Sequence, residues 1–378
     1  MRNNGINGRR GDMIGVIGGY GAVGIAAVQI LKKWNRYPLK IGGRNPEKAR
    51  EKLKKEFPDV RWSYVDVFND TSIADFAKDC IIIVNCVGPS HKVSSRVAKV
   101  CLSLNCHLVD AGIDKVLEEM NAIDAETCIR YGAGMTPGLT GILPQWLASE
   151  FDSVTSLQMY TGALDTFTPS GAEDYLVGVL DTSNEPLAAW RDGQKRQTAS
   201  KRKSAVHLPF FPREVSVFPF FDKESLLVAN ALKLVNGDWS LVIDGEHAPE
   251  VLNEVRLQFE NDPVKAVEKL CMAAALDLEG RKSYCNILLQ LDGLKDTTDK
   301  TVTALLQTEN VSQLTGTITA LVSMAVLEQE VTPGIGPAAS IPEPQKIIKR
   351  LQNSGILKQF IVLEASIESL CEEVEGEI

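Results

Sequence analysis

Short apolar runs and amphipathic segments alternate along the first third of the chain. The apolar runs predict strands at 14–18, 39–43, 61–66, 81–87, 107–111 and 127–131. The segments between them have helical periodicity, at 25–33, 46–57, 71–78, 94–104 and 115–126. The run Ile81–Val84 has no polar face, which is typical of a central strand covered by helices on both sides. This alternation predicts an α/β fold with a doubly wound parallel sheet.

The pattern changes after about Met135. A segment rich in Gly and Pro, 134–141, precedes predicted helices at 142–150, 171–180 and 263–276 and predicted strands at 153–162, 214–218, 232–235, 239–243, 282–291 and 301–307. These elements predict a second, α+β domain built on a mixed sheet. Two more helices are predicted, at 314–327 and 345–351, with a loop at 332–341 between them. The acidic tail is predicted to fray.

The first predicted strand leads directly into the pattern Gly19-x-Gly21-x-x-Gly24, and a helix follows. In such a unit the first glycine allows a tight turn, the second lets the backbone approach a pyrophosphate, and the third lets the helix pack on the strand. Any tight strand-to-helix turn can use glycine, but the surrounding alternation favours a bound dinucleotide. Residues 1–134 are therefore predicted to form a dinucleotide-binding Rossmann domain, and residues 135–330 a second domain, for which the family resemblance given below implies a role in substrate binding and dimerisation.

The end of the second predicted strand indicates which dinucleotide binds. Arg44 stands there, at a position where an NAD enzyme usually has an acidic residue for the ribose hydroxyls. Lys40 and Lys48 are further cations nearby. A guanidinium suits a 2′-phosphate through paired, charge-assisted hydrogen bonds, which favours NADP(H) over NAD(H). The alternative is that Arg44 only caps a solvated turn before the next helix.

The composition is that of an ordinary globular protein. The 378 residues suggest two or three domains, and 44% of them are hydrophobic and 24% charged. The net charge of −9 argues against a nucleic-acid partner, which favours a basic surface. The longest apolar run, 80–88, is too short to cross a bilayer, and the polar opening at 1–12 has no signal-peptide core. A soluble, cytoplasmic protein without a membrane partner is therefore expected.

The cysteines give no sign of a metal or disulfide scaffold. Most of the eight cysteines lie inside apolar segments, and no Cys-x-x-Cys or His-x-x-His spacing occurs. Small buried thiols are therefore expected, and no metal is predicted.

Three separated motifs resemble one family. The glycine turn is followed by Gly42-Gly43-Arg44-Asn45, by a Val87-Gly88-Pro89 turn with His107-Leu-Val-Asp110-Ala-Gly112, and by Ala133-Gly134-Met-Thr-Pro137-Gly138-Leu-Thr-Gly141. Together they resemble the saccharopine dehydrogenase and reductase-like NADP-binding family. The resemblance covers most of the chain and continues into Leu314-Thr315-Gly316 and Val331-Thr-Pro-Gly334. The chain departs from the pattern at Gly112-Ile113-Asp114, where the family often has Gly-Glu.

The resemblance implies a Rossmann domain that residues 331–378 complete and a substrate domain that often carries the contact of a homodimer. It also implies that the pyridine nucleotide reduces, or regenerates, a C=N bond between an amine and a carbonyl partner. The predicted function is therefore an NADPH-dependent oxidoreductase that reduces an imine in an amino-acid-like or amine-derived small molecule. The alternatives are an enoyl (C=C) reductase of a biosynthetic pathway and a non-catalytic NADP-binding accessory protein.

The loops after four neighbouring strands are expected to converge on one crevice, because ligands of such sheets lie at the carboxyl ends of the strands. The residues predicted to bind NADP(H) are Gly19, Tyr20, Gly21, Ala22, Val23, Gly43, Arg44, Asp66, Val87, Gly88, Pro89, Ala111, Gly112 and Pro137. The turn at 87–89 is placed near the nicotinamide, although an ordinary strand-ending turn has the same composition. Segment 134–138 is placed over the ring or the substrate, although a plain linker would look similar.

Other candidates depend on single residues. Hydride transfer needs position before it needs chemistry, so no side chain is obligatory. His91 and Tyr131 are the candidates for a catalytic role in proton transfer, with a surface or capping role and a core role as the respective alternatives. Helix 314–327 is expected either to present N–H groups of Thr315 and Gly316 to an anion or to pack against a neighbouring element.

Three cations of the second domain are candidates for binding a substrate carboxylate: Arg191, Lys195 and Arg213. Long cationic side chains are usually solvated, and that is the alternative for each of them.

Overall fold

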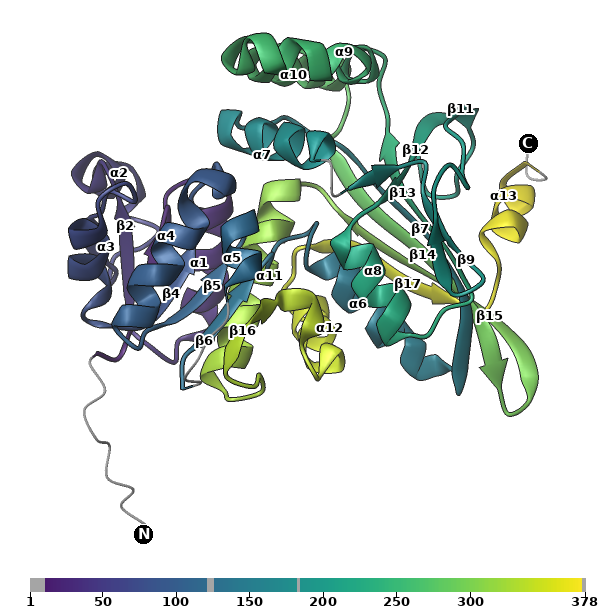
Figure 1. Ribbon diagram of the computed structural model, residues 1–378. Helices are drawn as coiled ribbons and strands as arrows, with labels where there is room; N and C mark the ends of the chain where they lie inside the picture. Colours follow the sequence, from purple (N-terminus) through teal and green to yellow (C-terminus); the bar gives the residue numbers. More distant parts are fainter. Residues whose placement is uncertain (1–10, 121–125, 182–183, 376–378) are drawn as a thin grey trace. The chain divides into compact units, whose positions relative to one another are not determined.

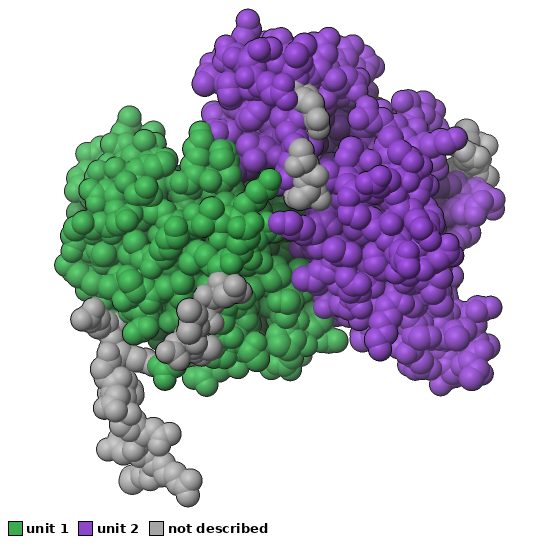
Figure 2. Space-filling model, in the orientation of Figure 1, with its two compact units in different colours: residues 1–139, 312–354 green, residues 140–311, 355–378 purple. Residues whose placement is uncertain are grey.

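The computed structural model describes residues 11–120, 126–181 and 184–375. The chain divides into two compact units, each built from two segments (Figure 2). Unit 1 holds Met1–Leu139 and Ser312–Ser354, and unit 2 holds Thr140–Val311 and Gly355–Ile378.

Unit 1 is built on a seven-stranded parallel sheet (Figure 1). The strands are β1 Met13–Ile17, β2 Leu39–Gly43, β3 Arg61–Tyr64, β4 Cys80–Asn85, β5 His107–Asp110, β6 Cys128–Tyr131 and β16 Gly334–Pro337. Their order is β16-β6-β5-β4-β1-β2-β3, and every pairing is parallel. The order of the strands reverses between β1 and β4, which is where doubly wound sheets bind their ligands.

The core of unit 1 lies on both faces of its central strands. Ile14 and Val16 on β1 and Ile82 on β4 are completely buried on one face, and Ile17 and Ile83 are completely buried on the other. The connecting helices are α1 Ala22–Trp34, α2 Pro46–Leu53, α3 Asp70–Ala77, α4 Ser90–Ser103 and α5 Lys115–Glu119. Strands buried on both faces confirm the predicted doubly wound α/β architecture.

The second segment of unit 1 adds α11 Val311–Leu327, β16, the short η2 Ala338–Ser340 and α12 Pro344–Gln352. Helix α11 packs directly on α1, because a Cβ atom on Gly316 would lie 2.1 Å from the carbonyl oxygen of Val23. Strand β16 pairs with β6 from Gly334 opposite Cys128 to Pro337 opposite Tyr131. The buried Arg130 holds this connection, since its Nη1 donates to the carbonyl oxygen of Gly334 at 2.7 Å.

Unit 2 is built on a mixed ten-stranded sheet. Its strands are β7 Ser153–Leu164, β8 Glu185–Pro186, β9 Ala189–Arg191, β10 Gln194–Arg196, β11 Lys203–Val206, β12 Val215–Phe221, β13 Asn236–Ile243, β14 Tyr284–Lys295, β15 Thr298–Thr308 and β17 Leu357–Leu363. The main path is β10-β9-β13-β7-β14-β15-β17. Strands β13 and β7 are parallel, whereas β14 pairs antiparallel with both β7 and β15. The mixed sheet and its helices confirm the predicted α+β second domain.

The helices of unit 2 are α6 Leu139–Leu147, η1 Ala148–Glu150, α7 Pro169–Leu180, α8 Lys223–Ala231, α9 His247–Asn261, α10 Pro263–Leu278 and α13 Ile367–Glu375. Helices α7, α9 and α10 stack on one another (Figure 1) around a buried cluster that includes Leu176, Val255 and Leu270. This cluster gives the three helices a small core of their own.

Several local predictions are wrong. Residues 232–235, predicted as a strand, form a turn after α8, and Asp222 and Ser225 start that helix with a capping box. The predicted helix 115–126 ends at Glu119, and residues 121–125 lie outside the described part of the chain. Most of the tail predicted to fray is helical, in α13. The predicted loop 332–341 contains β16, which tolerates its Gly and Pro because it is an edge strand.

The two units also differ from the predicted domain ranges. Helix α11 falls in unit 1 instead of the range 135–330, because Gly316 packs on the backbone of α1. Residues 355–378 fall in unit 2 instead of completing the Rossmann domain, because β17 pairs antiparallel with β15. Of the predicted C-terminal segment, only the part up to Ser354 joins unit 1.

Candidate functional site

The glycine turn between β1 and α1 is tightly built except at one position. Gly18 has a φ of +75°, and the N–H of Gly21 donates to the carbonyl oxygen of Gly18 at 2.9 Å. A Cβ atom on Gly24 would lie 2.1 Å from the same oxygen, so this glycine is required for the helix to approach the turn. A Cβ atom on Gly21 would meet only that oxygen, at 3.3 Å. The contact at Gly21 is tight but much milder than the one at Gly24, and beyond its chain neighbours no other atom lies within 4 Å of that Cβ position, which leaves space for a ligand on this side of Gly21.

The N-terminus of α1 provides hydrogen-bond donors at this turn. The bonds of the helix begin with the N–H of Ile25, which donates to the carbonyl oxygen of Gly21 at 2.9 Å. The N–H groups of Ala22 and Val23 precede that bond and have no partner within the helix. The first turn contains no acidic residue. Free donors at the positive end of a helix dipole, with no carboxylate in that turn, fit a pyrophosphate.

Tyr20 joins the glycine turn to the end of β2. Its hydroxyl accepts a hydrogen bond from the N–H of Asn45 at 2.8 Å. A Cβ atom on Gly43 would lie 2.2 Å from that hydroxyl, so the ring of Tyr20 lies against Gly43. Gly19 packs on β2 as well, because its Cβ would lie 2.9 Å from Cγ2 of Ile41. The structure thus brings the predicted residues of the first two loops together.

Arg44 follows β2 directly, and its side chain is exposed. It makes no hydrogen bond or ion pair with any residue in the described ranges, and neither does the exposed Lys48. A guanidinium without a protein partner at this position fits a 2′-phosphate. The alternative in which Arg44 caps the turn is not supported by any contact of its side chain with the described residues.

Lys40 is not available to a cofactor, contrary to the sequence interpretation. It is 2% exposed, and its Nζ donates to the carbonyl oxygen of Phe76 at 2.8 Å and lies 3.6 Å from Oδ2 of Asp79. Lys40 is the second residue of β2, so its position is near the amino end of the strand, opposite to the expected site. Charge alone, read from the sequence, does not distinguish the two ends of a strand.

Asp66 stands two residues after β3. This loop lies beside the end of β2, because the N–H of Val65 donates to the carbonyl oxygen of Gly43 at 3.0 Å. The carboxylate of Asp66 accepts the N–H of Phe68 at 3.0 Å, which closes a local turn. A role of Asp66 in binding the cofactor stays a prediction.

A buried pair of polar side chains holds the loops after β4 and β5 together. Nδ2 of Asn85, at the end of β4, donates to Oδ2 of Asp110, at the end of β5, at 2.7 Å. Oδ1 of Asp110 accepts the N–H of Gly112 at 2.9 Å, and Oδ1 of Asn85 accepts the N–H of Val87 at 3.3 Å. Asp110 is 1% exposed, and burial raises its pKa to about 7, while the hydrogen bonds from Asn85 and Gly112 act in the opposite direction.

Ser90 and Gly112 make a close contact between the same two loops. A Cβ atom on Gly112 would lie 2.2 Å from Cβ of Ser90, and the hydroxyl of Ser90 donates to the carbonyl oxygen of Ile113 at 2.9 Å. Pro89 caps the start of α4 immediately before Ser90. The predicted residues Val87, Gly88 and Pro89 are thus fixed beside Ala111 and Gly112, whose position depends on Asp110.

The loop after β6 lies against the same region. The N–H of Ala133 donates to the carbonyl oxygen of Asp110 at 2.9 Å, and the N–H of Gly134 donates to that of Pro137 at 3.0 Å. Helix α11 contacts this loop, since the hydroxyl of Thr319 donates to the carbonyl oxygen of Ala133 at 2.8 Å. Pro137 therefore belongs to a short loop that is anchored to the end of β5.

Helix α11 does not present Thr315 and Gly316 at its N-terminus. The helix begins at Val311, so both residues lie in its second turn. The packing of Gly316 on α1 confirms the alternative interpretation, in which the small residue serves helix contact. The predicted start at residue 314 is wrong because the hydrophobic pattern does not include the polar first turn.

The two catalytic candidates have different surroundings. His91 is the second residue of α4 and is half-buried, next to the turn at 87–89. Tyr131 ends β6 and is part of the buried apolar cluster of unit 1, and burial raises its pKa. This placement favours the core role for Tyr131. A catalytic role for either residue stays a prediction.

The sequence interpretation missed Asn85 and Asp110 as members of the site. Each is a polar residue that ends an otherwise apolar strand, at neighbouring positions in the sheet. A buried polar residue needs a hydrogen-bond partner, so two of them at paired strand ends could have been recognised as an interacting pair.

The three cations of unit 2 each pair with a carboxylate. Nη2 of Arg191 lies 2.7 Å from Oδ1 of Asp238, Lys195 pairs with Glu185, and Nε of Arg213 lies 2.7 Å from Oδ1 of Asp244. None of the eight cysteines forms a disulfide, and five of them are buried. Among the described residues, no group of His, Cys, Asp or Glu has the arrangement of a metal site, and no helix is long and apolar enough to span a membrane.

The geometry agrees with a comparison of the sequence with known families. Residues 14–131 match the family described as "Saccharopine dehydrogenase NADP binding domain". This match confirms the predicted resemblance for most of the first segment of unit 1. It supports NADP(H) as the cofactor, as predicted from Arg44.

Solved structures extend the likeness of the fold over nearly the whole chain. Saccharopine dehydrogenase (L-Glu forming) from Saccharomyces cerevisiae is 14% identical, with a TM-score of 0.67, and the alignment covers 93% of this chain and 100% of the yeast chain. DAP dehydrogenase from C. glutamicum is 13% identical, with a TM-score of 0.45 over 92% of this chain and 100% of the other. The first likeness shows a shared fold, and the second is too weak to bear on function.

The matched domain and the fold together support an oxidoreductase that uses NAD or NADP.

Proposed function

We propose, on the premise that residues 14–131 form a saccharopine dehydrogenase NADP binding domain, that the protein is an NADPH-dependent oxidoreductase acting on a C=N bond. The substrate class is an amino-acid-like or amine-derived imine. The observation that carries the proposal is the open space beside Gly21 next to an unpaired Arg44, at the ends of two adjacent parallel strands.

The residues of the first two loops account for binding. The N–H groups of Ala22 and Val23 are the donors for the pyrophosphate, and Arg44 is the cation for the 2′-phosphate. When bound, NADPH supplies the hydride for the reduction. The protein contributes position, because holding two reacting carbons in contact supplies much of the rate of a transfer that needs no covalent help.

The residues of the loops after β4 and β5 hold the backbone in place at the other end of the proposed site. Asn85 and Asp110 bind each other and fix the backbone at Val87 and Gly112. Asp110 has both carboxylate oxygens engaged, so we assign it as a positioning residue. Loops fixed by buried hydrogen bonds already have their final geometry, so no free energy is needed to reorganise them when the reaction occurs.

The proposal is tested by mixing the purified protein with NADPH and imines formed from amino acids or amines with aldehydes or 2-oxo acids. Loss of NADPH fluorescence reports turnover. With NADPH deuterated at the transferable position, we expect deuterium on the carbon of the former C=N bond. The Gly21→Val variant is the control, because a branched side chain occupies the space beside the turn and should abolish turnover in a folded protein.

Two other results would replace the proposal. Deuterium incorporated into enoyl substrates and not into imines would identify a C=C reductase. Tight binding of NADPH without turnover over both panels would identify an accessory protein. The homodimer and the cytoplasmic location stay predictions, and light scattering of the purified protein measures the first.

A further inference from the structure

Unit 2 contains an open pocket of about 600 Å³ that the proposed function does not use. Its lining residues come from the loop before β12, the start of β14, and strands β15 and β17. They are Phe210, Phe211, Pro212, Arg213, Arg281, Lys282, Ser283, Tyr284, Gln307 and Lys358. Four of these ten residues are Arg or Lys, and none is Asp or Glu. The lining is therefore both aromatic and cationic.

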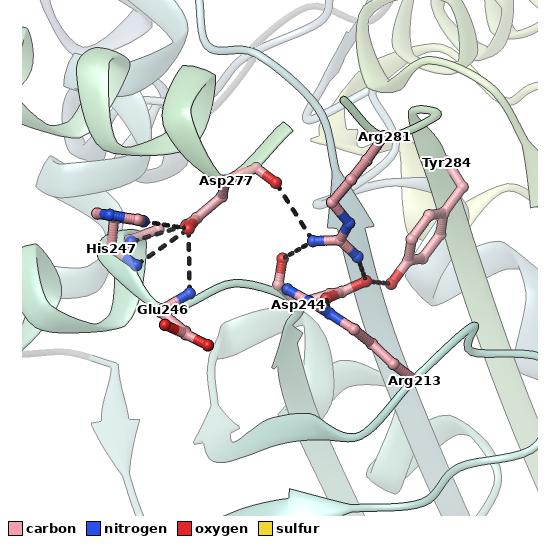
Figure 3. A network of polar contacts seen from close by, with 8 residues as sticks. Arg213, Asp244, Glu246, His247, Asp277, Arg281 and Tyr284 are labelled. Carbon is pink, nitrogen blue, oxygen red and sulfur yellow. Dashed lines mark hydrogen bonds and ion pairs between the residues drawn. The ribbon is translucent and has the colours of Figure 1, made fainter. Parts of the chain in front are cut away.

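Asp244 fixes two arginines of the lining (Figure 3). Its side chain is 1% exposed, and its Oδ1 accepts Nε of Arg213 at 2.7 Å. Its Oδ2 accepts the hydroxyl of Tyr284 at 2.6 Å and a bond from Nη2 of Arg281. Burial opposes the charge of Asp244, but the hydrogen bonds from Tyr284, Arg213 and Arg281 outweigh it and keep its pKa below the usual range.

Asp277 gives Arg281 a second anchor. Nη1 of Arg281 donates to the carbonyl oxygen of Asp277 at 3.2 Å. The carboxylate of Asp277 accepts the N–H groups of Glu246, His247 and Ala248 at the start of α9, at 2.9 to 3.0 Å (Figure 3). The start of α9, the end of α10 and the start of β14 are therefore linked through two buried carboxylates. An arginine held at both ends of its fork is rigid before any ligand arrives.

Arg213 retains a free edge. Only its Nε bonds to a residue in the described ranges, and its two Nη atoms bond to none of them. Its side chain is 48% exposed. A guanidinium anchored by Nε presents two parallel N–H groups along its other edge, and this fork matches the two oxygens of a carboxylate.

The acidic residues near the pocket do not line it. Asp244 pairs with both arginines, and Nζ of Lys358 lies 2.9 Å from Oε1 of Glu309. Lys282 is exposed and makes no ion pair with the described part of the chain. A lining with four cations and no carboxylate favours an anion.

The aromatic wall is held in place by buried amides. Phe210 has a φ of +68°, which a bulky residue rarely adopts, and its carbonyl oxygen accepts Nδ2 of Asn286 at 2.9 Å. Asn286 is completely buried, and its Oδ1 accepts Nε2 of Gln307 at 3.0 Å. A left-handed backbone persists only where the surroundings enforce it, and such positions gather at ligand-binding sites.

We infer that this pocket binds a small organic carboxylate, with the carboxylate on the free edge of Arg213 and the apolar part of the molecule against Phe210. The aromatic wall distinguishes this ligand from inorganic phosphate, which offers no apolar surface. The inference does not depend on the reaction proposed above, because all lining residues belong to unit 2 and no nucleotide is involved.

Calorimetry of the full-length protein without nucleotide tests the inference. The probes are 3-phenylpropionate, hexanoate and succinate, with 3-phenylpropanol as the uncharged counterpart and inorganic phosphate as the competing anion. We expect at least one carboxylate to bind and 3-phenylpropanol not to bind. Arg213→Gln should weaken that binding by about tenfold to a hundredfold, the usual effect of losing a charged hydrogen-bond pair.

Arg196→Gln is the matched control. It also removes an exposed arginine of unit 2, but Arg196 does not line the pocket. We expect its affinity for the carboxylate to equal that of the unchanged protein. Equal losses in both variants would show a general charge effect and overturn the assignment of the site.

Two further results would overturn the inference. One is that none of the three carboxylates binds, or that Arg213→Gln binds them as tightly as the unchanged protein does. The other is tighter binding of phosphate than of all three, which would assign the site to an inorganic anion. If Arg213→Gln does not fold, as judged by circular dichroism, Lys282→Glu replaces it, because this exposed side chain supports no contact among the described residues. Unchanged affinity in Lys282→Glu would then refute the site.

Discussion

At the scale of single residues, the choice between the two dinucleotides depends on Arg44. We predict that Arg44→Asp weakens the binding of NADPH by about tenfold to a hundredfold, because a carboxylate repels the 2′-phosphate where a charged hydrogen-bond pair existed. The binding of NADH should change little or improve, since a carboxylate accepts hydrogen bonds from the free ribose hydroxyls. Fluorescence titration with both dinucleotides measures the two affinities.

The control for this charge change is Arg50→Asp. Arg50 is an exposed cation on α2 of the same unit, six positions further along the chain. Its replacement alters the net charge equally, so it should leave the ratio of the two affinities unchanged. An equal loss of NADPH and NADH in Arg44→Asp would contradict the assignment of NADP(H).

Asp110 makes the stability of unit 1 depend on pH. Burial raises its pKa from 3.8 to about 7, so between these values the folded state binds a proton that the unfolded state has released. The free energy of unfolding therefore falls as pH rises through this range. We predict that Asp110→Asn removes this contribution. Relative to that variant, the free energy of unfolding of the unchanged protein should fall by a few kcal/mol between pH 5 and pH 8, at about 1.4 kcal/mol per pKa unit.

Urea unfolding at both pH values measures the difference. Asp299→Asn, on an exposed carboxylate of β15, is the control and should follow the unchanged protein at each pH. If Asp110→Asn also follows it, Asp110 does not hold its proton in the folded state, and the raised pKa is contradicted.

At the scale of elements, two glycines of one turn serve different purposes. We predict that Gly21→Ala folds normally and binds NADPH more weakly, because its Cβ lies in the space left for the pyrophosphate. Gly24→Ala should instead destabilise unit 1 by about 1–3 kcal/mol, because its Cβ lies 2.1 Å from a backbone oxygen. Thermal unfolding and NADPH titration of both variants separate the two effects. Loss of stability in Gly21→Ala would contradict the proposed role of this glycine.

The contact between α1 and α11 is tested by a pair of helical glycines. Gly316→Ala places a Cβ 2.1 Å from the carbonyl oxygen of Val23 and should destabilise unit 1 by about 1–3 kcal/mol. Gly178→Ala, in α7, places its Cβ where no atom lies within 4 Å, and should stabilise unit 2 by about 0.5–1 kcal/mol. Opposite shifts of the unfolding midpoint are expected. An unchanged or raised midpoint in Gly316→Ala would show that the helices are not packed at Gly316.

The sequence predicted the elements of unit 1 well because each has one strong local pattern. Strand β2 has the predicted bounds, and β1, β3, β4, β5 and β6 differ by a few residues, whereas β16 was predicted as a loop. Helix α9 and strand β17 were missed, because α9 is too polar to show one apolar face clearly and β17 is largely exposed at the edge of its sheet. The predicted strand 232–235 failed because a short apolar run does not distinguish a strand from the buried end of a helix.

At the scale of the whole molecule, unit 1 is not continuous in sequence. We predict that a fragment of residues 1–139 does not unfold cooperatively, because it lacks α11 and β16 and exposes the surfaces that these elements cover. A fusion of residues 1–139 to 312–354 through a short Gly/Ser linker should unfold cooperatively and bind NADPH. The ends to be joined are near each other, since the N–H of Met135 lies 3.4 Å from Oγ1 of Thr315. Circular dichroism and NADPH titration compare the two proteins, and equal behaviour would contradict the prediction.

The candidate site could be predicted from the sequence only where its residues directly follow a recognisable strand. The glycine turn and Arg44 follow directly from their strands, so a local pattern finds them. The pocket of unit 2 draws on residues as far apart as Phe210 and Lys358, and its central carboxylate, Asp244, has no local signal. Local patterns also do not show which unit each C-terminal segment joins. The packing of Gly316 on α1 places one segment in unit 1, and the pairing of β17 with β15 places the other in unit 2.

The position of β16 at the edge of the parallel sheet has a consequence for how the protein is made on the ribosome. The partner of β6 is more than two hundred residues further along the chain and leaves the exit tunnel only after nearly all of unit 2 has been synthesised. Domains generally fold in the order in which they are translated, but here the nucleotide-binding unit is completed late. A nascent chain halted before residue 334 therefore carries the whole phosphate-binding turn on an unfinished scaffold.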